Sequence, residues 1–137
     1  MTLAAPPVAQ VRVLYADTDQ MGVVNNVHYL RWFEIGRAEW IRARGTTYRT
    51  IEAEGYFLPV VEAHLRYKAS ARYDDLIDVF AEPRDLRAAT ATFHYRLVRA
   101  GTGELLCEGF TRHACVGRDG KVRRFSPALS AMLRVSP

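Results

Sequence analysis

The first hydrophobic pattern in the chain is a short alternation. Val11, Val13 and Tyr15 are separated by polar or flexible residues, which predicts a strand over residues 9–15. A polar, glycine-containing stretch at residues 17–22 follows and predicts a loop. The chain is therefore expected to begin with a strand that runs into a loop.

The longest predicted helix covers residues 27–44. Asn25 and Asn26 supply candidate N-cap side chains before it, and Gly45 follows its end. Its apolar residues form two overlapping stripes: Leu30, Phe33 and Ile41 on one, and Tyr29, Trp32, Gly36 and Trp40 on the other. A helix that is apolar over so wide an angle needs other structure packed around it.

After a short helix predicted over residues 48–54, the hydrophobic period changes from helical to two residues. In residues 60–68 the odd positions are apolar and the even positions polar, which predicts a strand with one buried face. The residues expected on that face are Val61, Ala63, Leu65 and Tyr67. Further strands are predicted over residues 76–87, 89–99 and 104–116, and a short helix over residues 128–133 after Pro127.

This order of elements groups an antiparallel sheet around one long helix, which is typical of the α+β class. A length of 137 residues fits one domain, residues 1–137. The edges and outer face of such a sheet remain exposed, so we expect a homo-oligomer. The predicted assembly is a dimer that extends the sheet, with two such dimers in a homotetramer.

Composition bears on the location of the protein, on the state of its cysteines and on the charge of its partners. Residues 1–8 lack the charged and apolar regions of a signal peptide, and no later apolar run has membrane-spanning length, which predicts a cytoplasmic protein without membrane insertion. Cys107 and Cys115 fall in one predicted strand and stand roughly 26 Å apart when extended, so we expect two buried thiols and no intrachain disulfide. The net charge of +4 fits a partner with phosphates and a generic basic surface equally well.

The chemistry of the chain concentrates just before the long helix. Asp17 and Asp19 lie in the predicted loop, close to a helix start whose free N–H groups and dipole can polarise a carbonyl oxygen. A nearby carboxylate can attack that carbonyl or activate a water molecule. From the chemistry alone, however, the structural alternative is favoured, in which both aspartates only cap turns.

The motif itself changes this balance. The pattern aromatic-x-Asp-Thr-Asp-x-x-Gly-Val-Val, followed by Phe33-Glu34-x-x-Arg37-x-Glu39, resembles the 4-hydroxybenzoyl-CoA thioesterase family, especially its Tol-Pal-associated acyl-CoA thioesterase branch. The resemblance extends from about Val11 to the last strand. It implies the hotdog fold, in which an antiparallel sheet wraps around a long central helix. It also implies that Asp19 is the catalytic carboxylate and Asp17 an orienting neighbour.

The resemblance further implies that a backbone N–H at the helix start, here that of Asn26, holds the thioester oxygen. The branch often has a histidine at this position, so the asparagine is a departure, but a main-chain donor survives any side chain except proline. His28 lies two residues further on and does not superimpose on Asn26 along a helix. We expect His28 to cap the helix or line a pocket.

The resulting hypothesis is hydrolysis of an acyl-CoA thioester to a free acid and CoA, with Asp19 as nucleophile or as general base. The predicted pocket walls are His28, Tyr29, Trp32 and Phe33. No cofactor is expected, because coenzyme A is part of the substrate. Its phosphates are expected to meet a few of eight basic residues: Lys68, Arg72, Arg84, Arg87, Arg118, Lys121, Arg123 and Arg124.

Other functions find less support in the sequence. The four histidines show no metal-ligand spacing, and neither a nucleophile elbow nor a phosphate-binding glycine loop is present. Rings such as Tyr95 alternate toward the buried side, which argues against nucleic-acid stacking. Two rivals keep the fold: a non-catalytic acyl-CoA-binding or regulatory module, and a hydratase, for which no catalytic histidine motif is found.

Overall fold

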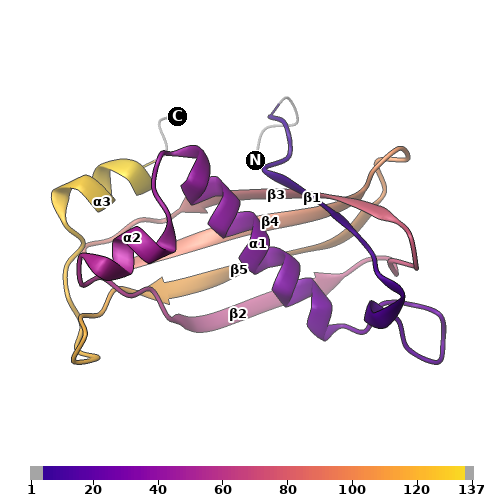
Figure 1. Ribbon diagram of the computed structural model, residues 1–137, viewed down its shortest axis with the longest axis horizontal. Coiled ribbons are helices and arrows are strands. Elements are labelled where there is room, and N and C mark those ends of the chain that lie inside the picture. Colours follow the sequence, from indigo (N-terminus) through magenta and orange to yellow (C-terminus); the bar gives the residue numbers. More distant parts are fainter. Residues whose placement is uncertain (1–4, 135–137) are drawn as a thin grey trace.

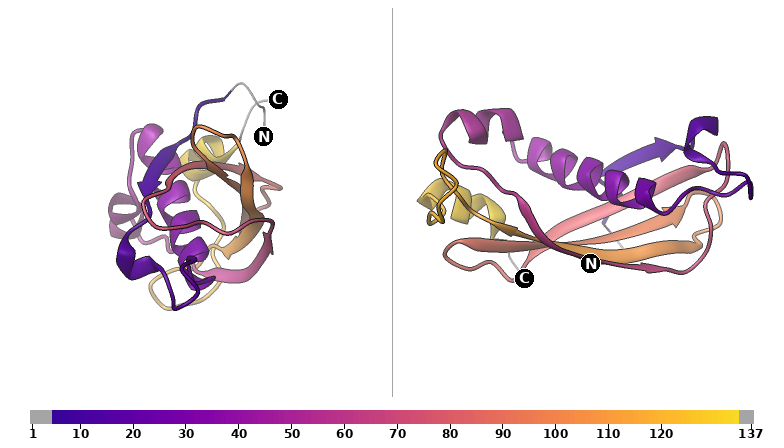
Figure 2. Two further views of the ribbon diagram at one scale, coloured as in Figure 1. Left: turned by 90° about the vertical axis from the view of Figure 1, so that its right-hand side faces the viewer. Right: turned by 90° about the horizontal axis from the view of Figure 1, so that it is seen from below.

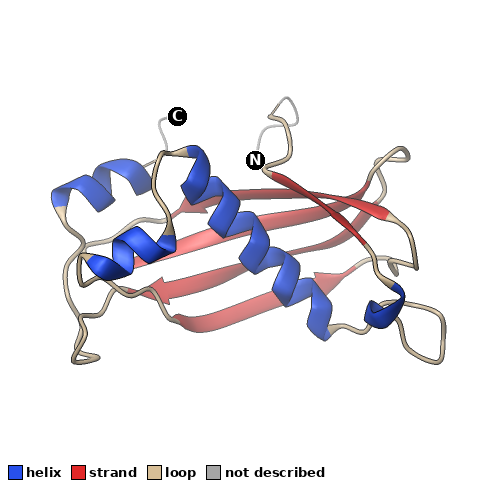
Figure 3. Cartoon of the chain, in the orientation of Figure 1, coloured by secondary structure: helices blue, strands red, loops and turns tan. Residues whose placement is uncertain are grey.

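The computed structural model describes residues 5–134 and folds them into an antiparallel sheet with one long helix lying across it (Figures 1 and 3). In chain order the elements are β1 (Ala9–Arg12), the 3₁₀ turn η1 (Tyr15–Asp17), α1 (Val27–Ala43), α2 (Tyr48–Ala53), β2 (Val60–Tyr67), β3 (Leu76–Arg84), β4 (Thr90–Arg99), β5 (Leu105–Ala114) and α3 (Pro127–Leu133). The views in Figure 2 place α1 on one face of the sheet. The predicted α+β class is confirmed.

The sheet has the strand order β1-β3-β4-β5-β2, and every neighbouring pair is antiparallel. The connection from β4 to β5 is a tight turn in which Gly101 and Gly103 have φ values of 90° and 75°. Glycine tolerates this left-handed backbone, so both positions suit the turn between the two strands. Because β2 pairs with β5 at one end and β1 with β3 at the other, β1 and β2 are the two edges of the sheet.

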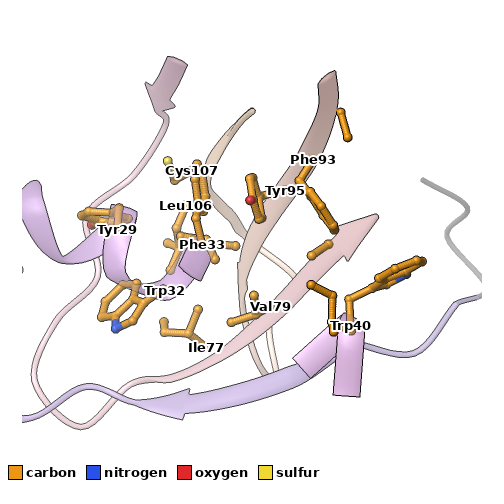
Figure 4. Close-up of a cluster of buried hydrophobic side chains, with 14 of the residues drawn as sticks. Tyr29, Trp32, Phe33, Trp40, Ile77, Val79, Phe93, Tyr95, Leu106 and Cys107 are labelled. Atoms are coloured by element: carbon orange, nitrogen blue, oxygen red, sulfur yellow. The ribbon is translucent and has the colours of Figure 1, made fainter. Parts of the chain in front are cut away.

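The core lies between α1 and the sheet and is rich in aromatic side chains (Figure 4). The Phe33 ring stacks on Tyr95, with centroids 4.2 Å apart and planes 8° from parallel. Trp40 meets Phe93 edge to face at 5.7 Å. Such pairs add about 1 kcal/mol each to the burial of the rings. The helix is therefore fixed over β4 at two points along its length.

Gly36 allows α1 to lie close to β3. A Cβ atom at this position would stand 2.7 Å from Val79 Cγ1 and 3.3 Å from Ala81 Cβ. Glycine inside a helix costs about 1 kcal/mol relative to alanine, but here it removes a clash with the sheet. The apolar stripe of α1 thus includes one residue that acts through its missing side chain.

A chain of buried polar groups crosses the core beside these rings. His113 Nδ1 lies 2.9 Å from the Leu58 carbonyl oxygen, Thr111 Oγ1 lies 2.8 Å from His113 Nε2, and Tyr95 Oη lies 2.6 Å from Thr111 Oγ1. A carbonyl only accepts, so Nδ1 carries the proton, Thr111 donates to Nε2, and Tyr95 donates to Thr111. Burial lowers the pKa of His113 to about 4, so the ring is neutral near pH 7.

Several predicted boundaries and burial patterns need correction. The predicted strand over residues 9–15 ends at Arg12, because the Asp17 carboxylate accepts the Leu14 N–H at 2.9 Å and draws the chain into η1. The buried face predicted for residues 60–68 is largely exposed: Val61 is 58% and Tyr67 47% exposed. The reason is that β2 has a neighbouring strand on one side only.

The stripe pattern of the long helix is confirmed with one exception. Tyr29, Trp32, Phe33, Gly36, Trp40 and Ile41 are buried. Leu30 is 41% exposed, because it lies on the side of α1 that faces away from the sheet. The exposed Leu30 and the exposed edge strand therefore leave apolar surface uncovered on the protomer.

Both cysteines are buried and free, as predicted. Burial raises the pKa of the Cys107 thiol to about 12 and also raises that of Cys115, so both stay protonated. Within residues 5–134, no helix has the length and apolarity needed to cross a membrane.

The buried neutral His113 predicts a loss of stability in acid. The unfolded chain binds a proton at this histidine near pH 6.5, but the folded chain does so only near pH 4, so the contribution is present above pH 6.5 and is lost as the pH falls toward 4. The full loss is about 3 kcal/mol. It is measured as the difference between wild type and His113→Asn in the slope of unfolding free energy against pH. Parallel slopes for the two proteins would contradict the assignment.

Candidate active site

The loop that carries the two aspartates is a small hairpin between η1 and α1. Thr18 and Val24 form an antiparallel bridge, Asp19 N–H donates to the Val23 carbonyl at 3.0 Å, and Asn25 N–H donates to the Asp17 carbonyl at 3.1 Å. The tip is a turn in which Gly22 N–H donates to the Asp19 carbonyl and Gly22 has a φ of 77°. The hairpin therefore returns the chain directly to the start of α1.

Asp19 stands at the tip of this hairpin with an exposed side chain. Its Oδ1 accepts the Met21 N–H at 2.8 Å, an Asx turn that orients the carboxylate. Oδ2 accepts no hydrogen bond from any residue that the structure describes. One oxygen is thus held in place by the backbone, and the other is available for chemistry.

Asp17 differs from Asp19 in being buried, with 3% of its surface exposed. Its Oδ2 accepts the Leu14 N–H, and its Oδ1 lies 2.7 Å from Arg31 Nη2 in the second turn of α1. His28 Nδ1 is 3.6 Å from the same oxygen, so His28 lies beside Asp17. A buried carboxylate with an arginine and a main-chain N–H fixes η1 against α1.

The start of α1 leaves one main-chain donor without a partner. Asn25 Oδ1 accepts the Val27 N–H at 3.1 Å, while the carbonyls of Asn25 and Asn26 accept the N–H groups of His28 and Tyr29. Asn26 N–H donates to no group in residues 5–134. Of the two predicted capping side chains only Asn25 caps, because Asn26 already has helical φ and ψ values of −56° and −28°.

A second loop, between β2 and β3, is tied to the same hairpin. Val24 N–H donates to the Ala71 carbonyl at 2.9 Å, and Val23 pairs with Arg72 in an antiparallel bridge. The buried Tyr29 hydroxyl accepts the Ala71 N–H at 3.0 Å, which fastens this loop to the first turn of α1. Both loops lie at the same end of the molecule in Figures 1 and 2.

The other predicted pocket residues lie behind this end of the helix. Tyr29 is 2% exposed, and Trp32 and Phe33 are fully buried, so in the protomer these three side chains belong to the core. Their role as pocket walls stays a prediction, as does that of the half-buried His28. Sequence reasoning missed Tyr67, the last residue of β2. Its hydroxyl donates to the Asn26 carbonyl at 3.4 Å. The resemblance extends from about Val11 to the last strand and so includes Tyr67, which was the available signal.

Comparisons with known proteins identify the family of the chain. Residues 13–133 match the model of the thioesterase-like superfamily. The chain belongs to this superfamily. The acyl-CoA thioesterase YbgC of Haemophilus influenzae is 36% identical over 107 residues, which cover 77% of this chain and 77% of that protein.

Two solved structures show the same architecture. The hypothetical protein TT1821 from Thermus thermophilus superimposes with a TM-score of 0.85 at 36% identity, covering 91% of this chain and 95% of that one. The DHNA-CoA thioesterase from Staphylococcus aureus gives a TM-score of 0.85 at 27% identity, covering 90% and 85%. The hotdog fold is therefore confirmed, and this member of the superfamily is a thioester hydrolase. Membership of the 4-hydroxybenzoyl-CoA branch stays a prediction.

The capping difference between Asn25 and Asn26 is testable. Asn25→Ala removes the acceptor of the Val27 N–H and is expected to lower the free energy of unfolding by about 1 kcal/mol. Asn26→Ala, the matched control, removes no capping bond and is expected to leave stability nearly unchanged. Urea unfolding of both variants measures the difference. Equal losses in the two would contradict the assigned cap.

Proposed function

We propose that this thioesterase hydrolyses an acyl-CoA thioester to a free carboxylic acid and CoA, with Asp19 as its catalytic carboxylate. The relative from Haemophilus influenzae is named an acyl-CoA thioesterase, and the structural neighbour from Staphylococcus aureus a DHNA-CoA thioesterase. A CoA thioester is accordingly the substrate class. A thiolate leaves readily, so the site needs a nucleophile or base and an oxyanion donor more than a strong general acid.

The observation that carries this proposal is that two groups without protein partners occur at the same end of α1. The Asn26 N–H lacks a protein acceptor, and the Asp19 Oδ2 lacks a protein donor, within residues 5–134. The Asn26 N–H points out of a helix N-terminus, where the dipole adds to its effect on a developing oxyanion.

Two reaction courses fit the pair. As nucleophile, the Asp19 carboxylate adds to the thioester carbon, the carbon–sulfur bond breaks, and the CoA thiolate leaves and takes up a proton. Water then hydrolyses the mixed anhydride to the acid and the restored carboxylate. As general base, Asp19 takes a proton from water while the hydroxide adds to the same carbon, and the proton passes to the thiolate. In both courses the thioester oxygen accepts from Asn26 N–H.

The proposal includes a second copy of the chain along β2. Val61 and Tyr67 are exposed on this edge strand, and Val27 and Leu30 are exposed on the neighbouring part of α1. An edge strand with free backbone groups and apolar neighbours favours pairing with another strand. Antiparallel pairing of two β2 strands would extend the sheet and cover this surface. It would also shield the exposed Asp19 from solvent. The acyl group would then enter beside α1, past His28 and Tyr29.

Asp19→Asn tests the carboxylate. The amide keeps the acceptor for Met21 N–H, so the fold is expected to stay intact, while kcat falls by about 10²-fold or more because the charge is lost. Asp119→Asn is the matched control, because Asp119 accepts the Lys121 N–H in the same Asx geometry at 3.0 Å. Release of CoA from a panel of acyl-CoA substrates, followed with a thiol reagent, gives the rates. Full turnover by Asp19→Asn would disprove the mechanism, and tight binding without turnover by wild type would favour a binding module.

Asn26→Pro tests the main-chain donor. Proline removes the N–H, and the observed φ of −56° at this position suits its ring, so folding is expected to survive. Loss of an oxyanion donor predicts a fall in kcat of about 10²–10³-fold. Asn26→Ala keeps the N–H and is expected to retain turnover. Equal activity of the alanine and proline variants, with both folded by circular dichroism, would remove Asn26 from the mechanism.

A further inference from the structure

Coenzyme A carries an adenine ring and phosphates, and a pantetheine arm separates them from the thioester. A site for this nucleotide must therefore lie at the rim of the reaction centre rather than inside it. Its chemistry calls for a cation without a protein partner and for an exposed aromatic face.

Most of the basic residues named from the sequence already have partners. Arg118 donates to the carbonyls of Glu52 and Ala53, and Arg123 donates to that of Gly55. Lys68, Arg84 and Arg87 face Glu108, Glu82 and Asp85 at 4.0, 2.8 and 3.7 Å. These five cations stabilise the protein's own turns and strands.

Three of the eight remain: the side chains of Arg72, Lys121 and Arg124 make no hydrogen bond or ion pair within residues 5–134. Lys121 and Arg124 follow β5 at the end of the molecule that holds α2 and α3 (Figure 1). Arg72 lies at the opposite end, in the loop that pairs with Val23 beside the Asp19 hairpin. Among the three, only Arg72 is near the candidate site.

The backbone around Arg72 is held firmly while its side chain is free. Arg72 N–H donates to Asp75 Oδ2 at 2.8 Å, and its carbonyl accepts the Asp75 N–H at 3.1 Å. Arg99 Nη1 lies 3.0 Å from the same Asp75 oxygen and holds the carboxylate in place. Because the backbone of this loop is fixed, a ligand that binds Arg72 has to order only its side chain, which limits the entropic cost of binding.

An exposed pair of tyrosines adjoins this arginine. Tyr73 follows Arg72 in the chain, and its ring meets Tyr15 edge to face with centroids 5.8 Å apart. Tyr73 is 58% and Tyr15 77% exposed. Tyr15 begins η1, directly before the Asp17–Asn25 hairpin. Two large rings held at the surface beside a free cation offer a stacking face for a nucleotide base.

We propose that Arg72 and the Tyr15–Tyr73 pair bind the nucleotide end of acyl-CoA, with the guanidinium on a phosphate and the Tyr73 ring against the adenine. This inference rests on the proposed function and adds the residues that distinguish a CoA thioester from a simpler thioester. They act in binding and do not touch the reacting carbon. Their loss therefore affects KM for the complete substrate and leaves kcat in place.

The test compares two thioesters of the same acyl group, one with CoA and one with N-acetylcysteamine, which lacks the phosphates and the adenine. Arg72→Gln is expected to raise KM for acyl-CoA about tenfold with kcat unchanged, and to leave kcat/KM for the truncated thioester at the wild-type value. The KM of wild type for acyl-CoA is expected to rise more steeply with salt than that of the variant. Arg124→Gln, a free arginine at the far end, is the matched control and is expected to change neither substrate.

The tyrosine is tested in the same assay. Tyr73→Ala is expected to raise KM for acyl-CoA severalfold, whereas Tyr73→Phe keeps the ring and behaves as wild type. Adenosine 3′,5′-bisphosphate is expected to inhibit wild type competitively and Arg72→Gln more weakly. Equal effects of Arg72→Gln on both thioesters, or none on acyl-CoA, would overturn the nucleotide site while leaving the thioesterase intact. Absence of wild-type turnover with either thioester would instead overturn the proposed function.

Discussion

The hydrogen bonds at the start of α1 are the constraint on which the candidate site depends. Within residues 5–134, every main-chain N–H from Val24 to Tyr29 has a protein acceptor except that of Asn26. The hairpin before the helix, the Asn25 side chain, the loop at Ala71 and the carbonyls of Asn25 and Asn26 accept the others. A helix N-terminus normally exposes several such donors to water. Here the surrounding chain leaves a single one, so a carbonyl oxygen that approaches has one defined place to bind.

The two aspartates of the motif have separated into two roles through burial. Asp17 lies inside, bonded to Leu14 N–H and Arg31, and holds η1 against the helix. Asp19 lies outside, with one oxygen held by Met21 N–H and the other free. The same residue type thus fixes the loop at one position and offers a reactive group two residues later. The difference arises from the hairpin, which turns one side chain inward and the next but one outward.

The polar groups of the core described here are hydrogen-bonded to one another or protonated, and they take no part in the proposed reaction. The chain from Tyr95 through Thr111 and His113 to the Leu58 carbonyl is hydrogen-bonded at each step and ends within the protein. Both buried cysteines are held as thiols by raised pKa values. None of these groups needs a ligand to satisfy it. Three groups that lack a protein partner within residues 5–134 lie together at one end of the molecule: the Asn26 N–H, the Asp19 Oδ2 and the Arg72 side chain.

The sequence by itself determined the elements, the α+β class and the motif, because hydrophobic period and turn residues act over short distances. It could not determine that β2 is an edge strand with exposed Val61 and Tyr67, since alternation is the same in edge and central strands. It also could not tell which of Asn25 and Asn26 caps the helix, or which of the eight basic residues lies free beside the candidate site. Only the tertiary structure decided these points, because each depends on which distant groups approach: the Ala71 loop, the five partnered cations and the neighbour that β2 lacks.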